Sequence, residues 1–259
     1  MISTEEASTA DLGSGITVIG RGHSGTRAMS HTLSASGVYM GKPLNSTGDL
    51  VPAEPMYEAC RVMAKHVQYL GNYSWDFSRL HSIPIDPEFK RLIGIFLRSV
   101  LLSDNPLRGW KIPETTLVYP WIVRMYPEIR YIYWIRDPRD CILVSHMTDD
   151  LSKFGIPFDR SSNRRLMRAI SWKYQIDIFL ATPRPRNLIE IRFEDFVLHQ
   201  DQTLSRLKDF LGFPLEKIPV DPKSVGRWKS DKEIHTFDLF QSDAVKRYYP
   251  DIQKGIPSI

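Results

Sequence analysis

Short apolar runs alternate with longer amphipathic stretches along the 259 residues of this chain. Four of the runs are typical of buried strands, because they are short, rich in β-branched and aromatic residues, and followed by polar turns. Between them, apolar residues recur at helical spacing, as Met29 and Leu33 do. The predicted strands are 16–19, 109–112, 130–135 and 188–191.

Helices are predicted between these strands. A cluster of Gly, Pro, Asn, Ser and Thr at 41–55 predicts a long loop after the first helix. Strands that alternate with helices, each strand nearly all apolar, indicate a mainly parallel sheet of about 4–5 strands covered on both faces, an α/β fold. Ligands of such sheets bind beyond the carboxyl ends of the strands. The predicted helices are 26–36, 56–70, 87–103, 116–126, 138–147, 162–181, 194–211 and 242–248.

Length and composition predict one domain. We expect a single domain at 16–259 behind a flexible N-terminal tail at 1–15, which is rich in Ser, Thr and Glu. Cys60 and Cys141 form no Cys-x-x-Cys pair, which favours buried thiols in a reducing compartment. The first residues lack the basic and apolar regions of a signal peptide, and no apolar run approaches the roughly 18 residues of a membrane helix. A cytoplasmic protein without a membrane span is therefore expected.

The charge of the chain suits an anionic ligand. Its formal net charge is +4 and its pI is about 9.0, without the dense Lys/Arg block of a nucleic-acid groove. No His-Glu-x-x-His or comparable metal spacing occurs, so no catalytic metal is predicted. The sequence predicts no oligomeric state and no nucleic-acid partner.

A glycine-rich segment, Gly20-Arg21-Gly22-His23-Ser24-Gly25-Thr26-Arg27, follows the first strand. Its glycines permit a tight turn in which backbone N–H groups converge, and the next helix adds its positive end, so the turn is suited to phosphate. The spacing fits the nucleotide-hydrolase pattern GxxxxGK[ST], but Thr26 stands in place of the lysine, which argues against ATP or GTP hydrolysis. The fingerprint GxGxxG also matches, without the acidic residue expected about 20 residues later. A purely structural turn is the simpler alternative.

A second candidate anion site, Arg136-Asp137-Pro138-Arg139-Asp140, lies where the third strand ends. Asp137 can cap the following helix and Pro138 can begin it. Capping leaves Arg136 unexplained, and its guanidinium suits a phosphate at the carboxyl edge of the sheet.

These motifs resemble those of sulfotransferases that use 3′-phosphoadenosine-5′-phosphosulfate (PAPS), with a P-loop-like three-layer fold. The segment 23–29 is similar to the 5′-phosphosulfate loop, and its Gly-Thr-Arg-Ala part looks most like the carbohydrate-modifying branch of the family. The family usually has a lysine where this chain has His23. Segment 136–140 is similar to the 3′-phosphate motif, which continues to a serine eight positions after the arginine; here Val144 is eight positions after it and Ser145 nine.

Two further segments extend the resemblance over about 16–230. Segment 225–229 is similar to the Gly-x-Trp-Lys/Arg stretch that closes over the donor nucleotide. Segment 191–195 is similar to the family's Tyr-Glu-Asp strand end, and we interpret it as structural. The resemblance implies a donor-binding set of Arg21, Gly22, His23, Ser24, Gly25, Thr26, Arg27, Arg136, Ser145, Gly226, Arg227, Trp228 and Lys229.

Sulfuryl transfer requires cations at the leaving phosphate and a base for the acceptor. Segment 110–113 is similar to the Trp-Lys-x-Pro segment of bacterial sulfotransferases, so Lys111 is expected to stabilise the transferred group and Glu114 to accept the proton. His23 is a rival base and Glu54 a third. The remaining histidines, His31, His66 and His146 among them, are expected at packing or surface positions.

The resemblance implies PAPS as cosubstrate, PAP (adenosine 3′,5′-bisphosphate) as product, and no metal. The acceptor is expected to be a hydroxyl or amine of a glycan or small metabolite. Two alternatives remain open: an ATP-dependent P-loop kinase-like phosphotransferase, and a non-catalytic nucleotide-binding protein with a degenerate site.

Overall fold

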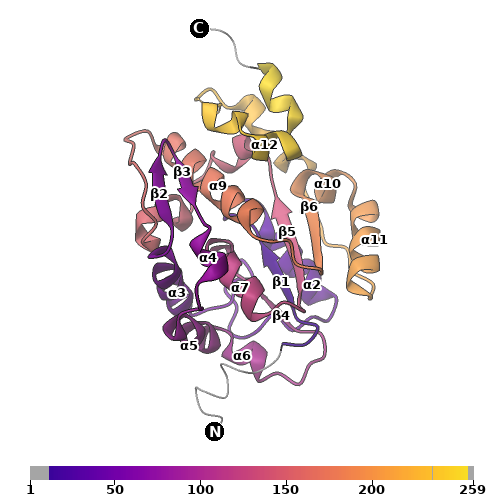
Figure 1. The fold of residues 1–259 in the computed structure, drawn as a ribbon. Helices are drawn as coiled ribbons and strands as arrows, with labels where there is room; N and C mark the ends of the chain where they lie inside the picture. The colour runs from indigo at the N-terminus through magenta and orange to yellow at the C-terminus, as the bar shows by residue number, and fades with distance from the viewer. Residues whose placement is uncertain (1–11, 235, 256–259) are drawn as a thin grey trace.

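A parallel four-stranded sheet forms the centre of the computed structural model, which describes residues 12–234 and 236–255 (Figure 1). Its strand order is β4-β1-β5-β6, and Ile16 at the start of β1 lies beside both Gly109 and Arg130. A two-stranded antiparallel hairpin, β2-β3, lies apart from this sheet. The strands are β1 (Ile16–Ile19), β2 (Gln68–Gly71), β3 (Ser74–Asp76), β4 (Gly109–Lys111), β5 (Arg130–Ile135) and β6 (Leu188–Arg192).

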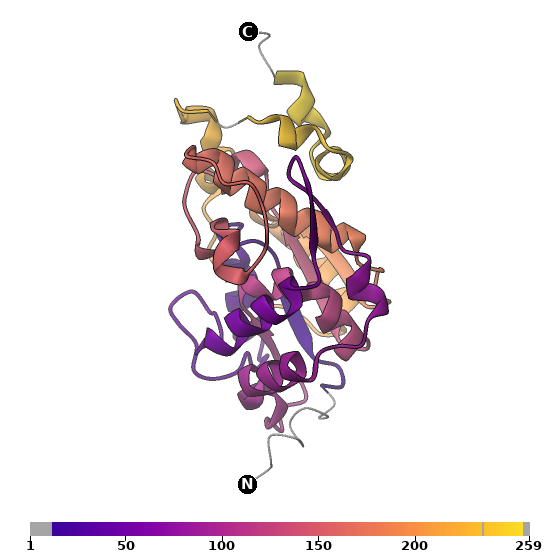
Figure 2. The ribbon, with the colours of Figure 1, turned by 60° about the vertical axis from the view of Figure 1, so that its left-hand side comes forward.

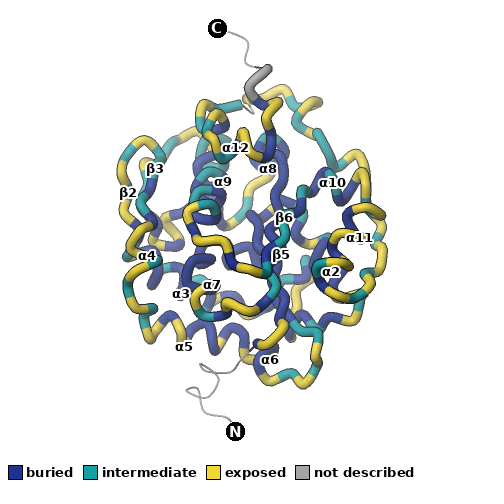
Figure 3. Tube along the Cα trace, turned by 45° about the vertical axis from the view of Figure 1, so that its right-hand side comes forward, coloured by how far each residue is buried: buried dark blue, intermediate teal, exposed yellow. Residues whose placement is uncertain are grey.

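Helices cover both faces of the sheet. In Figures 1 and 3, α3, α7 and α9 lie on one face, and α2, α10 and α11 on the other. Figure 2, turned by 60°, shows α9 crossing in front of the strands. The fold is thus the α/β three-layer arrangement that the sequence predicts. The helices are α2 (Thr26–Ala35), α3 (Glu54–Ala64), α4 (Arg79–Ser82), α5 (Pro87–Phe96), α6 (Arg98–Leu101), α7 (Tyr119–Met125), α8 (Pro138–Cys141), α9 (Arg164–Ala181), α10 (Phe193–Leu198), α11 (Gln200–Leu211) and α12 (Asp243–Tyr248).

Short 3₁₀ helices occupy several of the connections. They are η1 (Pro113–Val118), η2 (Met147–Asp149), η3 (Leu151–Phe154), η4 (Pro222–Ser224), η5 (Arg227–Ser230), η6 (Asp238–Gln241) and η7 (Pro250–Gly255).

The strands are apolar on both faces because each face has its own cluster of buried side chains. Trp134 of β5 packs with Met29 and Leu33 of α2, and its neighbours Tyr133 and Ile135 pack with the larger cluster on the opposite face. This alternation follows from the two-residue repeat of a strand. Figure 3 shows the strands as buried backbone between more exposed helices.

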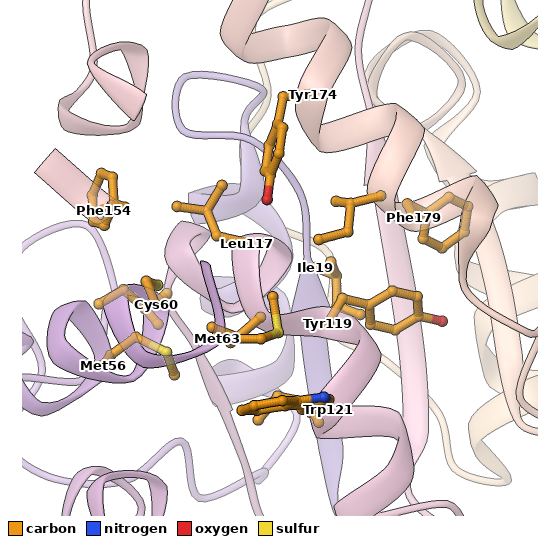
Figure 4. Close-up of a cluster of buried hydrophobic side chains, with 14 of the residues drawn as sticks. Ile19, Met56, Cys60, Met63, Leu117, Tyr119, Trp121, Phe154, Tyr174 and Phe179 are labelled. Atoms are coloured by element: carbon orange, nitrogen blue, oxygen red, sulfur yellow. The ribbon is translucent and has the colours of Figure 1, made fainter. Parts of the chain in front are cut away.

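The larger cluster is rich in aromatic rings, and Figure 4 shows part of it. Tyr133 stacks on Phe179 of α9 with ring centroids 3.4 Å apart, and Tyr119 stacks on the same ring at 5.3 Å. Trp121 meets Phe89 of α5 edge-on at 4.9 Å. These contacts fix α5, α7 and α9 against the sheet whose strand ends carry the candidate site.

Two predicted helices were wrong in extent. The helix predicted at 56–70 ends at Ala64, because residues 68–71 pair with β3 around a turn in which Gly71, Asn72 and Tyr73 all have positive φ. The helix predicted at 138–147 ends at Cys141, and a 3₁₀ turn follows at 147–149. The predicted helices 87–103, 116–126 and 194–211 are each divided into two shorter helical segments.

The predicted tail, 1–15, falls mostly on residues 1–11, which lie outside the described residues. Leu12 is buried in the larger core cluster, and its carbonyl accepts a hydrogen bond from the Gly15 N–H at 2.9 Å. Residues 12–15 are therefore packed against the domain. Within the described ranges, no helix combines the length and apolar character needed to cross a membrane.

Candidate functional site

A cavity of about 470 Å³ lies where β1, β4 and β5 end. The glycine loop follows β1, Lys111 ends β4, and Arg136 follows β5, so neighbouring parallel strands bring all three to one edge of the sheet. This is the edge at which ligands of such sheets bind. The 41–55 loop and the segment 218–227 contribute further lining residues.

The glycine loop is shaped by close contacts that exclude side chains. Gly25 has φ +93°, and a Cβ there would lie 2.5 Å from the Phe193 ring. A Cβ on Gly22 would lie 2.1 Å from the His146 ring. The helix that begins at Thr26 has no side-chain cap and no acidic residue in its first turn. The Ala28 N–H donates to the Gly25 carbonyl at 2.9 Å, which leaves the N–H groups of Thr26 and Arg27 available to an anion.

Two predicted donor-binding residues lie beneath the loop. Arg21 is buried, donates from Nη1 to the Cys141 carbonyl at 3.1 Å and forms an ion pair with Asp149. Ser24 is also buried, and its Oγ donates to the Arg21 carbonyl at 2.5 Å. Neither residue lines the cavity, so both support the loop from below. The loop residues that do line the cavity are Gly22, His23, Gly25, Thr26 and Arg27.

Arg136 lines the cavity and is held by groups from three parts of the chain. Its guanidinium donates to the His23 carbonyl at 3.4 Å and to the Ser224 carbonyl, and it pairs with Asp140 at 3.1 Å. The guanidinium carbon lies 4.1 Å from the centre of the Phe193 ring. Its buried Nε has no hydrogen-bond partner among the described residues. Such a fixed cation is suited to binding an anion.

Asp140 connects the arginine motif to the 226–229 segment. Its buried carboxylate accepts from the backbone N–H groups of Gly226 at 2.9 Å and Trp228 at 3.0 Å. The Arg139 guanidinium stacks on the Trp228 ring at 3.8 Å. Arg227 lines the cavity, whereas Gly226, Trp228 and Lys229 do not. The sequence did not reveal this contact, because Asp140 and its partners at 226 and 228 are more than 80 positions apart.

The serine predicted to end the 3′-phosphate motif lies outside the cavity lining. Val144, one position earlier, lines the cavity, and Ser145 is exposed. Because the helix ends at Cys141, neither residue is on a helix. The Ser145 backbone carbonyl lies near the His23 ring and raises its pKa, against the larger effect of burial.

Two imidazole rings flank Gly22 at the cavity. The rings of His23 and His146 are 5.5 Å apart, edge to face. Burial and the neighbouring Arg21 lower the pKa of His23, and the same causes, together with His23, lower the pKa of His146 to about 4. Both rings are therefore neutral at pH 7. His31, whose pKa is also lowered by burial, lines the cavity too, although both it and His146 were expected at packing or surface positions.

The end of β4 carries a buried ion pair. Lys111 is 2% exposed, and its Nζ donates to Asp49 Oδ1 at 2.5 Å and to the Thr47 carbonyl at 2.8 Å. Burial lowers the pKa of Lys111, and Asp49 opposes that change. Asp49 was missed because it stands in the polar 41–55 loop, where the sequence gives no sign that the loop folds over the site.

Glu114 is 2% exposed and does not line the cavity, whereas its neighbour Pro113 does. Burial raises the pKa of Glu114 to about 7. Glu54, at the start of α3, is also absent from the cavity lining. Of the four proposed catalytic groups, Lys111 and His23 thus line the cavity, and Glu114 and Glu54 do not.

Metal ligands do not gather at this site. In the part of the chain that the structure describes, no group of three or more His, Cys, Asp or Glu residues is arranged to hold a metal ion.

Comparison with known proteins identifies the class of protein. The sulfotransferase family model matches residues 15–217, which include every element that lines the cavity except the 218–227 segment. The chain belongs to the sulfotransferase family. No curated protein matches it in sequence.

Two solved structures share the fold. The sulfotransferase domain from the curacin biosynthetic pathway is 16% identical, with a TM-score of 0.57 over 96% of this chain and 100% of that one. The sulfotransferase domain of the Synechococcus PCC 7002 olefin synthase is 13% identical, with a TM-score of 0.53 over 90% and 94% of the two chains.

Proposed function

We propose that this chain is a PAPS-dependent sulfotransferase that moves a sulfuryl group to a hydroxyl or amine of a glycan or small metabolite, with PAP as product. The observation that carries the proposal is the convergence of two anion-binding features, the glycine loop and Arg136, on one cavity. A donor with phosphate groups at both its 5′ and 3′ positions needs two such features. Membership of the sulfotransferase family supports this choice of donor.

The residues present fit such a donor. Gly22 packs against the His146 ring and Gly25 against the Phe193 ring so closely that no Cβ fits, which keeps the backbone of the loop in its tight turn. The uncapped N–H groups at the start of α2 adjoin this turn, which suits the 5′-phosphosulfate. Arg136 suits the 3′-phosphate, with Ser145 as a further proposed contact. The segment Gly226, Arg227, Trp228 and Lys229 is proposed to cover the nucleotide, and Asp140 already holds it beside Arg136.

The donor supplies the sulfuryl group, and residues of the chain position charges around it. Lys111 is proposed to stabilise the transferred group, since it is the cation at the end of β4 and lines the cavity. Glu114 is proposed as the proton acceptor because it adjoins Pro113 of the cavity lining and because burial raises its pKa to about 7, as a base at neutral pH requires. His23 remains the rival base, and its neutral ring already lines the cavity.

Calorimetric titration with PAP, beside ATP·Mg²⁺, tests the donor. We expect PAP to bind without magnesium and much more tightly than ATP. Arg136→Ala should weaken PAP binding at least tenfold, since a charge-assisted hydrogen bond contributes about 1.5–3 kcal/mol. Arg91→Ala is the matched control, because Arg91 is exposed and pairs only with Glu88 on α5.

Each alternative predicts a different result. Binding of ATP·Mg²⁺ without PAP would replace this proposal by a phosphotransferase. PAP binding without release of PAP from PAPS, across a set of hydroxyl and amine acceptors, would identify a nucleotide-binding protein instead. If turnover is found, Lys111→Met should lower kcat while leaving PAP affinity within a few-fold of the wild type.

A further inference from the structure

The glycine loop lacks the lysine that sulfotransferases usually have at the position of His23. The rings of two histidines, His23 and His146, lie at this loop. Both rings are neutral at pH 7, so each carries one N–H and one lone pair. An anion in the loop needs a donor. The question is which of His23 and His146 has a free N–H to offer.

The Ser145 backbone carbonyl lies near the His23 ring and raises its pKa. This favours a proton on the nitrogen that faces the carbonyl, so that in the neutral state the other nitrogen is an acceptor. A lone pair beside a phosphate or sulfate oxygen is repulsive. The neutral His23 ring is therefore the poorer candidate to replace the missing lysine as a donor, and its other nitrogen suits the role of a base.

His146 has the opposite tautomer. Its Nδ1 accepts the Thr148 backbone N–H at 3.2 Å and lies 3.0 Å from the Thr148 hydroxyl. The proton must then be on Nε2, for which no described residue supplies a partner. The ring lines the cavity and packs against Gly22 at the centre of the loop.

The position of His146 is fixed by the same residue that fixes the loop. Asp149 accepts the His146 backbone N–H at 2.6 Å and pairs with Arg21, which holds the Gly22 carbonyl at 2.8 Å. The imidazole and the glycine loop thus share one buried support. A donor held in this way loses little entropy when it binds an anion.

We propose that His146, rather than His23, supplies the hydrogen-bond donor that a lysine supplies in related enzymes, and that its Nε2–H binds the anionic group in the glycine loop. This inference rests on the proposed function, because it assigns the 5′-phosphate of the donor nucleotide to that loop. It makes His146 a binding residue for the reacting end of the donor and leaves His23 free to take a proton.

Two amide variants test the proposal. His146→Gln places an amide N–H near the position of Nε2, whereas His146→Asn keeps only a group near Nδ1 for Thr148. The affinity of each variant is measured by calorimetry for PAP and for adenosine 3′-phosphate, which lacks the 5′-phosphate. Thermal unfolding of both variants checks that the fold is retained.

We expect His146→Asn to bind PAP roughly tenfold or more weakly, because it loses a hydrogen bond to a charged group. His146→Gln should stay within about threefold of the wild type, on the same reasoning. Adenosine 3′-phosphate should bind the wild type and both variants alike, because it places no charge in the loop.

Other outcomes overturn the proposal. If the wild type binds PAP and His146→Asn binds it equally well, His146 is not the donor. If His23→Gln weakens the binding of PAP more than His146→Asn does, and leaves the binding of adenosine 3′-phosphate unchanged, the hydrogen-bond donor is His23. An equal loss of PAP and adenosine 3′-phosphate would show a general disturbance of the site. Failure of the wild type to bind PAP would overturn the proposed function itself, and this inference with it.

Discussion

Arg136 at the end of β5 and Lys111 at the end of β4 both bring a positive charge to the cavity, but they are held in different ways. Arg136 donates to two backbone carbonyls, pairs with the Asp140 carboxylate and lies on an aromatic ring. Lys111 is held by a carboxylate, Asp49, and a second carboxyl, that of Glu114, lies near enough to influence its pKa. The cation on the β5 side is thus held by backbone carbonyls and one carboxylate, whereas the cation on the β4 side has two carboxyl groups near it.

This difference separates nucleotide binding, at Arg136, from proton transfer, near Lys111 and Glu114. A guanidinium does not titrate in the physiological range, so an anion bound beside Arg136 experiences the same charge at any working pH. On the β4 side, burial lowers the pKa of Lys111 and raises that of Glu114 to about 7. Nucleotide binding should therefore vary little with pH, whereas proton transfer should depend on it.

The largest effect is expected from Gly25→Ala, which should reduce PAP affinity more than about 100-fold. Its Cβ would collide with the Phe193 ring on which Arg136 lies, in addition to a left-handed strain of about 1–2 kcal/mol. Gly37→Ala is the control, since Gly37 has a similar φ of +86° and no described atom lies within 4 Å of its Cβ position. Calorimetry with PAP measures both variants, and equal affinities would contradict the role given to backbone geometry.

Asp49→Asn should lower the free energy of unfolding by about 3 kcal/mol, because it leaves the buried Lys111 ammonium without its counter-charge. The double variant Asp49→Asn/Lys111→Met should recover much of that loss. Urea denaturation at pH 7 measures all three proteins. If the double variant were no more stable than Asp49→Asn, the loss would not come from the unpaired lysine.

Glu114→Gln should change how stability depends on pH. The folded pKa is about 7 and the unfolded value 4.5, so wild-type stability falls as pH rises from 4.5 to 7 and stays low above it. Glutamine removes this contribution, so the variant should be more stable above pH 7, by up to roughly 3 kcal/mol. Denaturation at pH 5 and pH 8 tests the sign, and a difference that did not change with pH would contradict it.

The smallest effect is expected from Asp140→Asn, which should weaken PAP binding by about threefold to tenfold. Asparagine keeps one acceptor for the N–H groups of Gly226 and Trp228 but loses the charge beside Arg136. Asp243→Asn, on the exposed surface of α12, is the control. An unchanged PAP affinity would mean that the 226–229 segment reaches its position beside the cavity without the Asp140 carboxylate.

The parts of the fold that the sequence predicts are those set by local pattern. All four strands of the main sheet and the glycine loop could be placed, because an apolar run followed by a glycine-rich turn has few other structures. The β2-β3 hairpin was missed although Gly71-Asn72 is a turn signal, since the residues before it, from Met56 on, continue a helical pattern. The local pattern alone did not distinguish a continued helix from a hairpin.

Local sequence pattern likewise identifies some residues of the site and not others. Arg136 and Lys111 could be identified because each lies near the end of a predicted strand, in a segment that resembles a sulfotransferase motif. Asp49 and His146 could not, because their roles depend on how two irregular segments fold over the strand ends. Only the tertiary structure shows that His146 packs against Gly22.

The order β4-β1-β5-β6 has a consequence for how the chain is made. β1 is synthesised first, yet its two partners begin only at Gly109 and Arg130, so this apolar strand has unpaired edges until about half of the chain exists. Pairing over such separations is slow, and exposed strand edges favour aggregation. The nascent chain should therefore be most vulnerable before β5 emerges from the ribosome, and cellular chaperones should matter most in that interval.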